Sequence, residues 1–295
     1  MIKARHACLL WTLCILLITS CSTASNSSTG QPLKQEPTPA PKASPPQPSN
    51  PEKLTTANKT TEPEPAASKE PPEDASNPPK YYVDTKNYKI HPLDEEKSEK
   101  IALLTFDDGP KGQVTTQILD ILDKYNAKSI WFVNGYNYGW DYQANPKKAE
   151  TFSTLLKEIH KRGHLIANHT WEHENLRKLT PEKQEKEIIS MNDLIENITG
   201  ERPKFFRPPF GAYSDVQKHV MKKENMQWMN WSVGSLDWEH KDPKEVVKQV
   251  VSTMHDGGNI LMHDLPVTAE ALEPILKELT GMGYRFVLPT EVRVE

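Results

Sequence analysis

The sequence predicts an α/β fold in which about seven parallel strands form an incomplete or distorted (β/α) barrel. Apolar or β-branched runs alternate with helical stretches between residues 98 and 295, which is the pattern of a parallel sheet with crossover helices. Polar clusters follow five of the seven runs, as at the rim of a barrel. The chain contains neither a Gly-x-Gly-x-x-Gly nor a Walker loop, which argues against a nucleotide cofactor.

The expected strands are short runs rich in apolar and β-branched side chains. They lie at 101–106, 129–133, 164–167, 204–206, 227–233, 259–262 and 284–288. The expected helices lie between them, at 113–124, 147–162, 181–199, 214–224, 243–255 and 268–281. The third of these helices is the clearest. Thr180 can cap it, Pro181 suits its first turn and Gly200 can end it.

The N-terminus is predicted to be a targeting segment, which we place at residues 1–20. Lys3 and Arg5 give it a positive start, and an almost unbroken apolar stretch follows from 9 to 18. This stretch is short for a membrane span and is typical of a signal peptide. The sequence Ile-Thr-Ser-Cys that ends at Cys21 resembles a bacterial lipobox, which implies cleavage and lipidation there. An uncleaved signal anchor is the alternative, and both interpretations place the remaining chain outside the cytoplasm.

Composition divides the remaining chain into three parts. Residues 21–80 are rich in Pro, Ser, Thr, Lys and Glu and have almost no large apolar side chains. Such a stretch cannot offset its ordering entropy, so we expect a disordered tether. Residues 81–97 are expected to pack on the domain as an N-terminal extension, and residues 98–295 to form the globular domain.

Cysteine content and charge exclude several classes of function. The three cysteines, Cys8, Cys14 and Cys21, all lie in the targeting segment or at its end, so the domain has no disulfide and no thiol catalysis. The formal net charge is −4. Without a broad basic excess, a nucleic-acid partner is disfavoured. Separately, we expect the protein to be a monomer.

The polar clusters that follow the strands contain the candidate functional residues. They are Asp107-Asp108, His169 with His173, Arg207-Pro-Pro-Phe-Gly, Asp237-Trp238 and His263-Asp264. All strand C-termini of a parallel barrel open on the same face, so side chains more than 150 positions apart are expected to meet on one rim. Polar residues placed at random would instead fall at both ends of the strands.

Two of these clusters together suit a metal ion. Two histidines and a carboxylate can hold a divalent ion and leave positions open for water and substrate, and the second aspartate can then act as a base.

Each cluster alone also has a structural interpretation. Asp-Asp-Gly-Pro is an ordinary turn, and histidines four residues apart can share one helical face. The other three clusters can be a loop with an ion pair, a capping carboxylate beside a core aromatic residue, and a buried strand end.

Five motifs, in this order along the chain, resemble those of a known family. They are Thr-Phe-Asp-Asp-Gly-Pro at 105–110, His-Thr-Trp-Glu-His at 169–173, Arg-Pro-Pro-Phe-Gly at 207–211, Asp-Trp at 237–238 and Leu-Met-His-Asp at 261–264. They are similar to the motifs of the NodB-homology polysaccharide deacetylases, carbohydrate esterase family 4. The resemblance covers roughly residues 98–295. It implies an incomplete (β/α) barrel and metal-dependent removal of acetyl groups from N-acetylated or O-acetylated sugars.

The resemblance implies a metal site with an adjacent base. Asp108, His169 and His173 would bind the metal, with zinc expected and Co²⁺, Ni²⁺ or Mn²⁺ as alternatives. Asp107 would be the general base, and Arg207 would orient it.

The resemblance also implies an acid and a substrate pocket. His263 would be the general acid, with Asp237 tuning it. The backbone N–H of Phe210 would help to hold the oxyanion, so the replacement of the family's commoner Tyr at this position should matter little. Trp238 and Leu261 would line the pocket for the acetyl methyl group.

The lipobox and tether make peptidoglycan the expected substrate, with other N-acetylglucosamine polymers next. Two further functions remain open. A non-catalytic cell-wall-binding lipoprotein would have lost its base or acid residue, and a non-haem iron oxygenase would use the same ligand types for Fe(II).

The aromatic-rich stretch at 134–148 can either stack on sugar rings or pack its loop onto the barrel.

Overall fold

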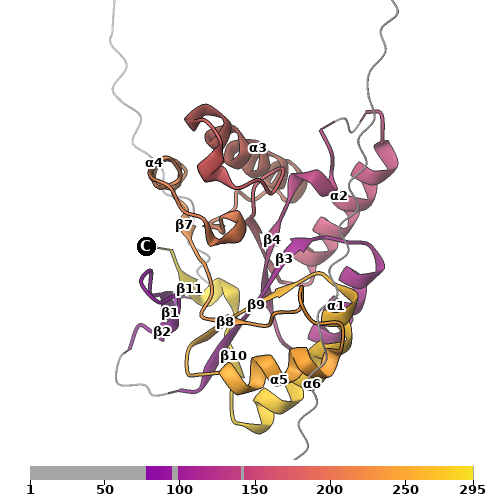
Figure 1. Cartoon of the computed structure of the whole chain (residues 1–295), viewed down its shortest axis with the longest axis vertical. Helices are drawn as coiled ribbons and strands as arrows, with labels where there is room; N and C mark the ends of the chain where they lie inside the picture. Colours follow the sequence, from indigo (N-terminus) through magenta and orange to yellow (C-terminus); the bar gives the residue numbers. More distant parts are fainter. Residues whose placement is uncertain (1–77, 95–98, 141–142, 295) are drawn as a thin grey trace, which may run out of the picture. The chain divides into compact units, whose positions relative to one another are not determined.

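A computed structural model describes residues 78–94, 99–140 and 143–294 (Figure 1). The expected signal peptide at 1–20, the lipidation site Cys21 and nearly all of the expected tether at 21–80 lie outside these described residues. Within them, no helix is both long and apolar enough to cross a membrane.

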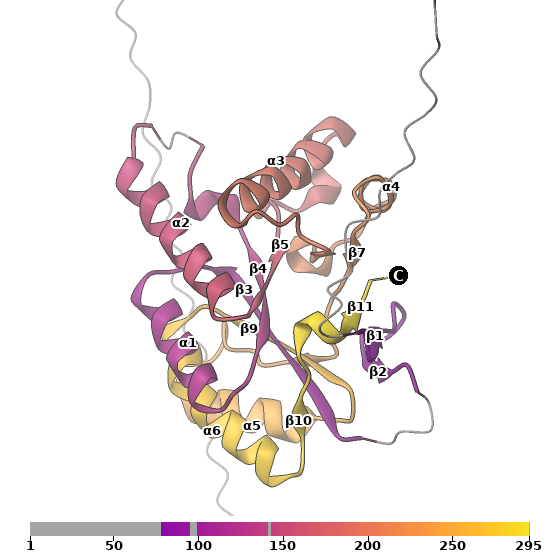
Figure 2. The ribbon, with the colours of Figure 1, turned by 180° about the vertical axis from the view of Figure 1, so that it is seen from behind.

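The centre of the fold is a curled sheet in which every strand pairing is parallel (Figures 1 and 2). Its strand order is β7-β6-β5-β4-β3-β9-β8, and β10 pairs with the start of β3. The strands are β3 (Ile101–Gly109), β4 (Ser129–Val133), β5 (Leu165–Asn168), β6 (Phe205–Phe206), β7 (Gln227–Trp228), β8 (Val233–Gly234), β9 (Gly258–His263) and β10 (Arg285–Phe286). In the described part of the chain no pairing joins β7 to β8. The barrel therefore stays open there, and the prediction of an incomplete (β/α) barrel is confirmed.

The single strand that we expected at 227–233 is in fact two strands at opposite edges of the sheet. β7 pairs with β6, whereas β8 pairs with β9. The residues between them cross the opening of the barrel. The Met229 N–H donates to the Phe206 carbonyl at 2.8 Å, and the Ser232 N–H donates to the Asn259 carbonyl at 3.1 Å. Between the two strands, Met229 is fully buried inside the barrel, so a large apolar side chain stands there although the chain is not in a strand.

Helices pack along the sheet close to the predicted positions (Figure 1). They are α1 (Gln113–Lys124), α2 (Pro146–Lys161), α3 (Pro181–Thr199), α4 (Asp215–Lys223), α5 (Pro243–Thr253) and α6 (Pro266–Gly281), with short 3₁₀ turns η1 (Gly135–Asn137), η2 (Leu176–Lys178), η3 (Pro209–Gly211) and η4 (Pro289–Glu291). α3 begins at Pro181, and Gly200, whose φ is 83°, is its C-cap, as predicted. Thr180 occupies the N-cap position, but its side chain makes no capping hydrogen bond. That part of the prediction is wrong.

Two hydrophobic cores lie on the two faces of the sheet. Along β3, Ala102, Leu104 and Phe106 belong to the outer core with the helices, whereas Ile101 and Leu103 belong to the inner core. This alternation follows the two-residue period of a strand. It directs the next odd-numbered side chains of β3 into the mouth of the barrel.

A second, small sheet closes the barrel at the other end. It consists of β1 (Tyr81–Val83), β2 (Ile90–Pro92) and β11 (Val292–Arg293). Tyr81, Val83 and Ile90 belong to the inner core together with Ile101, at the N-terminal end of β3. The rim at the C-terminal ends of the strands is thus the open end, where the polar clusters lie.

Candidate active site

The two carboxylates at the end of β3 reach the same side of the sheet because the strand is irregular there. In a regular strand, Asp107 and Asp108 would point to opposite faces. The register with β4 shifts between Asp107 and Gly109, and Asp108 has a φ of 67°, a left-handed backbone that is uncommon outside glycine. Both carboxylates consequently approach one imidazole. His169 Nε2 lies 3.5 Å from Asp107 Oδ2 and 3.8 Å from Asp108 Oδ1.

The two histidines lie in a tight loop directly after β5. Thr170 and His173 have φ values of 71° and 56°. The Thr170 N–H donates to Asn168 Oδ1 at 2.7 Å, and the His173 N–H donates to Thr170 Oγ1 at 3.1 Å. The ring centroids of His169 and His173 are 4.9 Å apart. Because this segment is not helical, the alternative of two histidines on one helical face is excluded.

Asp108, His169 and His173 form a triad of the kind that binds metals, with ligand atoms within 4.8 Å of one another. His169 Nδ1 donates to the Arg207 carbonyl at 2.6 Å, which leaves the Nε2 lone pair directed at the carboxylates. Burial, together with the nearby His169, lowers the pKa of His173 to about 4, so its imidazole is neutral near pH 7. Asp108 Oδ1 is buried without a hydrogen-bond partner, and a cation would satisfy it. The donor set therefore fits a divalent ion.

Arg207 lies behind the Asp107 carboxylate and has no exposed surface. Its Nη1 donates to Asp107 Oδ1 at 2.6 Å and to Thr105 Oγ1 at 2.9 Å. Its Nε and Nη2 donate to the carbonyls of Met229 at 2.9 Å and Asn230 at 3.1 Å. These two carbonyls belong to the segment between β7 and β8, so the guanidinium also spans the opening of the barrel.

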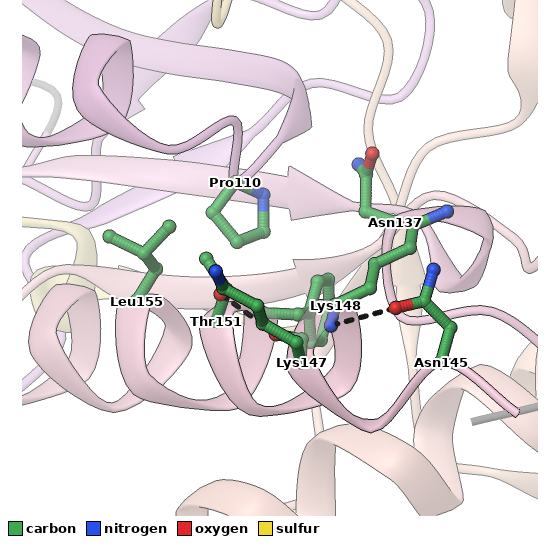
Figure 3. A pocket seen from close by; sticks show the side chains of 8 residues that line it. Pro110, Asn137, Asn145, Lys147, Lys148, Thr151 and Leu155 are labelled. Atoms are coloured by element: carbon green, nitrogen blue, oxygen red, sulfur yellow. Dashed lines mark hydrogen bonds between the residues drawn. The ribbon is translucent and has the colours of Figure 1, made fainter. Parts of the chain in front are cut away.

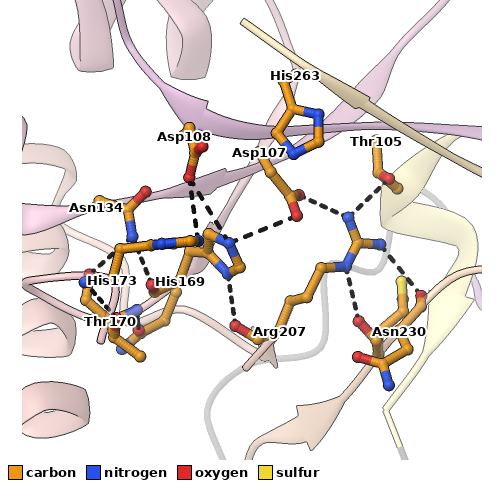
Figure 4. A network of polar contacts seen from close by, with 12 residues as sticks. Thr105, Asp107, Asp108, Asn134, His169, Thr170, His173, Arg207, Asn230 and His263 are labelled. Atoms are coloured by element: carbon orange, nitrogen blue, oxygen red, sulfur yellow. Dashed lines mark hydrogen bonds and ion pairs between the residues drawn. The ribbon is translucent and has the colours of Figure 1, made fainter. Parts of the chain in front are cut away.

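On the opposite part of the rim, Asp237 fixes His263 at the end of β9. His263 Nδ1 lies 2.7 Å from Asp237 Oδ1. Asp237 Oδ2 accepts from the His263 N–H at 2.6 Å and from the Thr268 hydroxyl at 2.5 Å. Burial lowers the pKa of His263, but the hydrogen bond and charge of Asp237 outweigh burial, and the pKa is raised above its usual value. Figure 4 shows the His263 ring beside Asp107, so the candidate acid and base are neighbours.

Comparison with known proteins agrees with this geometry. The family model described as polysaccharide deacetylase matches residues 94–229. A peptidoglycan-N-acetylglucosamine deacetylase of Bacillus cereus is 35% identical over 201 residues, which are 66% of this chain and 89% of that protein. The chain belongs to the polysaccharide deacetylase family.

Members of the polysaccharide deacetylase family differ in length. The peptidoglycan-N-acetylmuramic acid deacetylase PdaC of Bacillus subtilis is 37% identical over 198 residues, which cover 67% of this chain but 39% of PdaC. A second Bacillus cereus peptidoglycan-N-acetylglucosamine deacetylase is covered over 65% of its length. The chain thus spans less than two thirds of these relatives.

Solved structures of the family include both active and inactive proteins. The Bc1960 peptidoglycan N-acetylglucosamine deacetylase has a TM-score of 0.59 and 31% identity, over 67% of this chain and 90% of that one. BA3943 from Bacillus anthracis, described as a pseudoenzyme of carbohydrate esterase family 4, has a TM-score of 0.58 and 25% identity, over 67% and 68%. Membership of the polysaccharide deacetylase family therefore does not by itself establish catalysis, which depends on the residues present in the site.

The three remaining candidate residues lie around the triad and the acid. Phe210 is 67% exposed, and its ring meets His173 at 61°, with centroids 5.0 Å apart. Trp238 is 46% exposed and meets His263 edge-on, with centroids 5.1 Å apart. Leu261 is buried and lies opposite Thr105 in the β3–β9 pairing. Phe210 and Trp238 thus border the site from two sides.

Sequence reasoning missed several side chains that hold the site together. Asn134 Nδ2 donates to the His169 carbonyl at 2.5 Å, and Asn137 Nδ2 donates to the Asp108 carbonyl at 2.9 Å. Thr105 accepts a hydrogen bond from Arg207 in the same network. The two-residue period of β3 places Thr105 on the face of Asp107, so that period could have found it. The asparagines lie in or beside a 3₁₀ turn, where no periodic pattern marks them.

The aromatic residues after β4 pack on the domain. Trp140 stacks on Trp171 with centroids 4.0 Å apart, and the Lys186 ammonium lies 4.7 Å from the Trp140 centroid. Tyr138 meets Trp171 edge-on at 6.4 Å. A stack at 4.0 Å leaves no room for the ammonium on the same face, so both faces of Trp140 are occupied. For Tyr138 and Trp140 the packing alternative is favoured over sugar stacking, and Tyr142 lies outside the described residues.

Proposed function

We propose that this chain hydrolyses N-acetyl groups on a cell-wall glycan, with peptidoglycan as the first substrate and other N-acetylglucosamine polymers next. The observation that carries the proposal is the placement of a metal-binding triad, a candidate base and a candidate acid on one rim. Relatives named as deacetylases of N-acetylglucosamine and N-acetylmuramic acid in peptidoglycan support the substrate class.

Asp108, His169 and His173 would hold the metal. Two imidazoles and one carboxylate suit zinc with a coordination position left open, and Co²⁺, Ni²⁺ or Mn²⁺ are the substitutes we expect the same donors to accept. When bound, a divalent ion polarises the acetyl carbonyl and lowers the pKa of water.

Asp107 is the proposed general base. Its Oδ1 accepts from Arg207 at 2.6 Å, whereas its Oδ2 lies 3.5 Å from His169 Nε2 and faces the triad. The guanidinium fixes the orientation of this carboxylate in a fully buried position. Oδ2 is thereby placed to accept a proton from the attacking water, a contribution of about 10²–10⁴ in rate.

His263 is the proposed general acid. Its Nδ1 is engaged by Asp237, so the proton on Nε2 is the one available to the departing amine. The backbone N–H of Phe210 would donate to the oxyanion, and one such donor lowers the barrier by about 3 kcal/mol. Trp238 and Leu261 would border the acetyl methyl group.

The protein would act outside the cytoplasm as a lipoprotein of the cell membrane. A signal peptide at 1–20, a lipidated Cys21 and a tether at 21–80 would hold a monomeric domain, formed by 81–97 and 98–295, near the wall. Residues 1–77 lie outside the described part of the chain, so the sequence alone supports the anchor. Metabolic labelling with a fatty-acid analogue tests it, and Cys21→Ala should abolish the label.

The two other functions are disfavoured for different reasons. A non-catalytic wall-binding protein would keep the fold and lose the chemistry, yet Asp107 and His263 are both present with their hydrogen-bond partners. A non-haem iron oxygenase would share the triad, but the chain belongs to the polysaccharide deacetylase family. Metal analysis of protein purified without added metal tests the oxygenase directly, since it would carry iron.

Acetate release tests the proposed function. Purified protein should release acetate from peptidoglycan or from N-acetylglucosamine oligomers, lose this activity with a chelator and regain it with Zn²⁺ or Co²⁺. Absence of release from every acetylated glycan, with each of the four metals supplied, would refute the proposal.

A further inference from the structure

A hollow of about 400 Å³ lies between α2 and the segments that follow β3 and β4 (Figure 3). Its polar lining comes from Asn137, Asn145, Lys147, Lys148 and Thr151. Its apolar lining comes from Pro110, Phe152 and Leu155. The hollow therefore combines cationic and amide groups with apolar side chains.

The hollow is connected to the proposed metal site through two of its own residues. Asn137 Nδ2 donates to the carbonyls of Asp108 at 2.9 Å and Gly109 at 3.2 Å. Pro110 lies two positions after Asp108 on the same segment. A polymer seated with one sugar at the triad can thus place a substituent of a neighbouring sugar over this lining.

The charge of the lining is of one sign. Both ionisable residues that line the hollow are lysines, and no carboxylate lines it. Lys148 Nζ donates to the Tyr136 carbonyl at 2.6 Å, which fixes that ammonium and leaves it further donors. The Lys147 ammonium makes no hydrogen bond or ion pair with any other described residue. Lys147 is exposed, so it can pair with an incoming anion at little cost in desolvation.

We propose that this hollow binds a carboxylate carried by the sugar next to the one that loses its acetyl group. An ammonium pairs with a carboxylate, amide and hydroxyl groups supply further hydrogen bonds, and the apolar side chains suit a small alkyl group. A lactyl ether, which carries a methyl group beside a carboxylate, has this chemistry, as does the carboxylate of a short peptide attached to it. The inference rests on the proposed function, and it makes a carboxylate-bearing wall glycan a better substrate than a neutral N-acetylglucosamine polymer.

The sharpest test replaces Lys147, because Lys148 also holds the loop at Tyr136. Lys147→Gln is compared with wild type on three glycans of equal length: a neutral N-acetylglucosamine oligomer, one with alternating lactyl-bearing sugars, and one in which a short peptide is linked to the lactyl group. We expect a roughly three- to tenfold rise in KM on a carboxylate-bearing glycan and no change on the neutral one. Lys157→Gln, an exposed lysine on the same helix outside the hollow, is the matched control and should change nothing.

The two acidic glycans identify the source of the carboxylate. A Lys147 effect on the lactyl glycan assigns the group to the sugar itself, and an effect confined to the peptide-linked glycan assigns it to the peptide. Calorimetric binding of the same glycans to chelator-treated protein should show the same order without turnover. Equal parameters for wild type and Lys147→Gln on all three glycans would overturn the inference while leaving the proposed function intact. A wild type that releases acetate from none of them would instead refute the proposed function.

Discussion

Arg207 donates from Nη1 to Asp107 Oδ1 at 2.6 Å, and the side chains of both residues are almost completely buried. The backbone carbonyl of Arg207 accepts from His169 Nδ1, also at 2.6 Å. One residue therefore positions the proposed base through its side chain and a proposed metal ligand through its main chain. Buried charges occur in such pairs because an unpaired one costs several kcal/mol.

Substitutions of the neighbouring Asp107 and Asp108 are expected to have different effects on metal content and turnover. Asp107→Asn keeps the size of the side chain and leaves the triad intact, so bound metal should remain while kcat falls by about 10²–10⁴. Asp108→Ala removes one of the three proposed ligands, so the metal content should fall and activity with it. Mass-spectrometric metal analysis beside acetate release separates the two. An Asp107→Asn protein that loses its metal, or one that keeps its turnover, would contradict this division.

Arg207→Lys is expected to destabilise the fold as well as to slow the reaction. One ammonium cannot satisfy Asp107, Thr105 and two backbone carbonyls, so buried acceptors are left unpaired. We expect a loss of about 3 kcal/mol and a drop in Tm of roughly 6–12 °C for a domain of this size. Calorimetry measures both. Arg162→Lys is the control. That arginine pairs with three carboxylates but lies near the surface, where ion pairs contribute about 0–1 kcal/mol.

The alkaline limit of activity is expected to depend on Asp237. The proposed general acid must carry its proton, so activity should persist below the pKa of His263 and be lost as the pH rises through it. Asp237 raises that pKa, which should extend activity to higher pH. Asp237→Asn removes the charge, so the alkaline limb of the kcat/KM profile should move to lower pH. Thr268→Val removes only a hydrogen bond to Asp237 and should move the limb less. An unmoved limb in Asp237→Asn would exclude His263 as the acid.

Much of the fold and the composition of the rim could be predicted because they depend on periodicity. The expected helices at 113–124 and 181–199 match the bounds of α1 and α3. A parallel barrel then requires Asp107, His169 and His263 to lie on the same rim. The split of the strand expected at 227–233 could not be predicted in this way. An apolar run looks the same whether Met229 pairs within a sheet or crosses the opening of a barrel.

The orientation of the site side chains could not be predicted from sequence periodicity either. Period alone would place Asp107 and Asp108 on opposite faces, and only the irregular backbone at Asp108, with φ of 67°, turns both towards His169. Likewise, the histidine spacing left a shared helical face open as an alternative, whereas left-handed backbone at Thr170 and His173 forms a loop. Such conformations depend on hydrogen bonds between distant segments, which a local pattern does not encode.

The close packing of Gly109 against Asp264 predicts a coupling between these residues. A Cβ at position 109 would lie 2.8 Å from Asp264 Oδ2, and that oxygen is held by the Lys111 N–H at 2.9 Å and the Thr115 hydroxyl at 2.6 Å. We therefore expect Gly109→Ala to cost about 1–3 kcal/mol. Asp264→Ala in the same chain should recover part of this loss, because it removes the clash. Urea unfolding of both single variants and the double variant measures the coupling, with Gly281→Ala, whose Cβ meets nothing within 4 Å, as the control. Strictly additive losses would show that Gly109 and Asp264 do not compete for the same space.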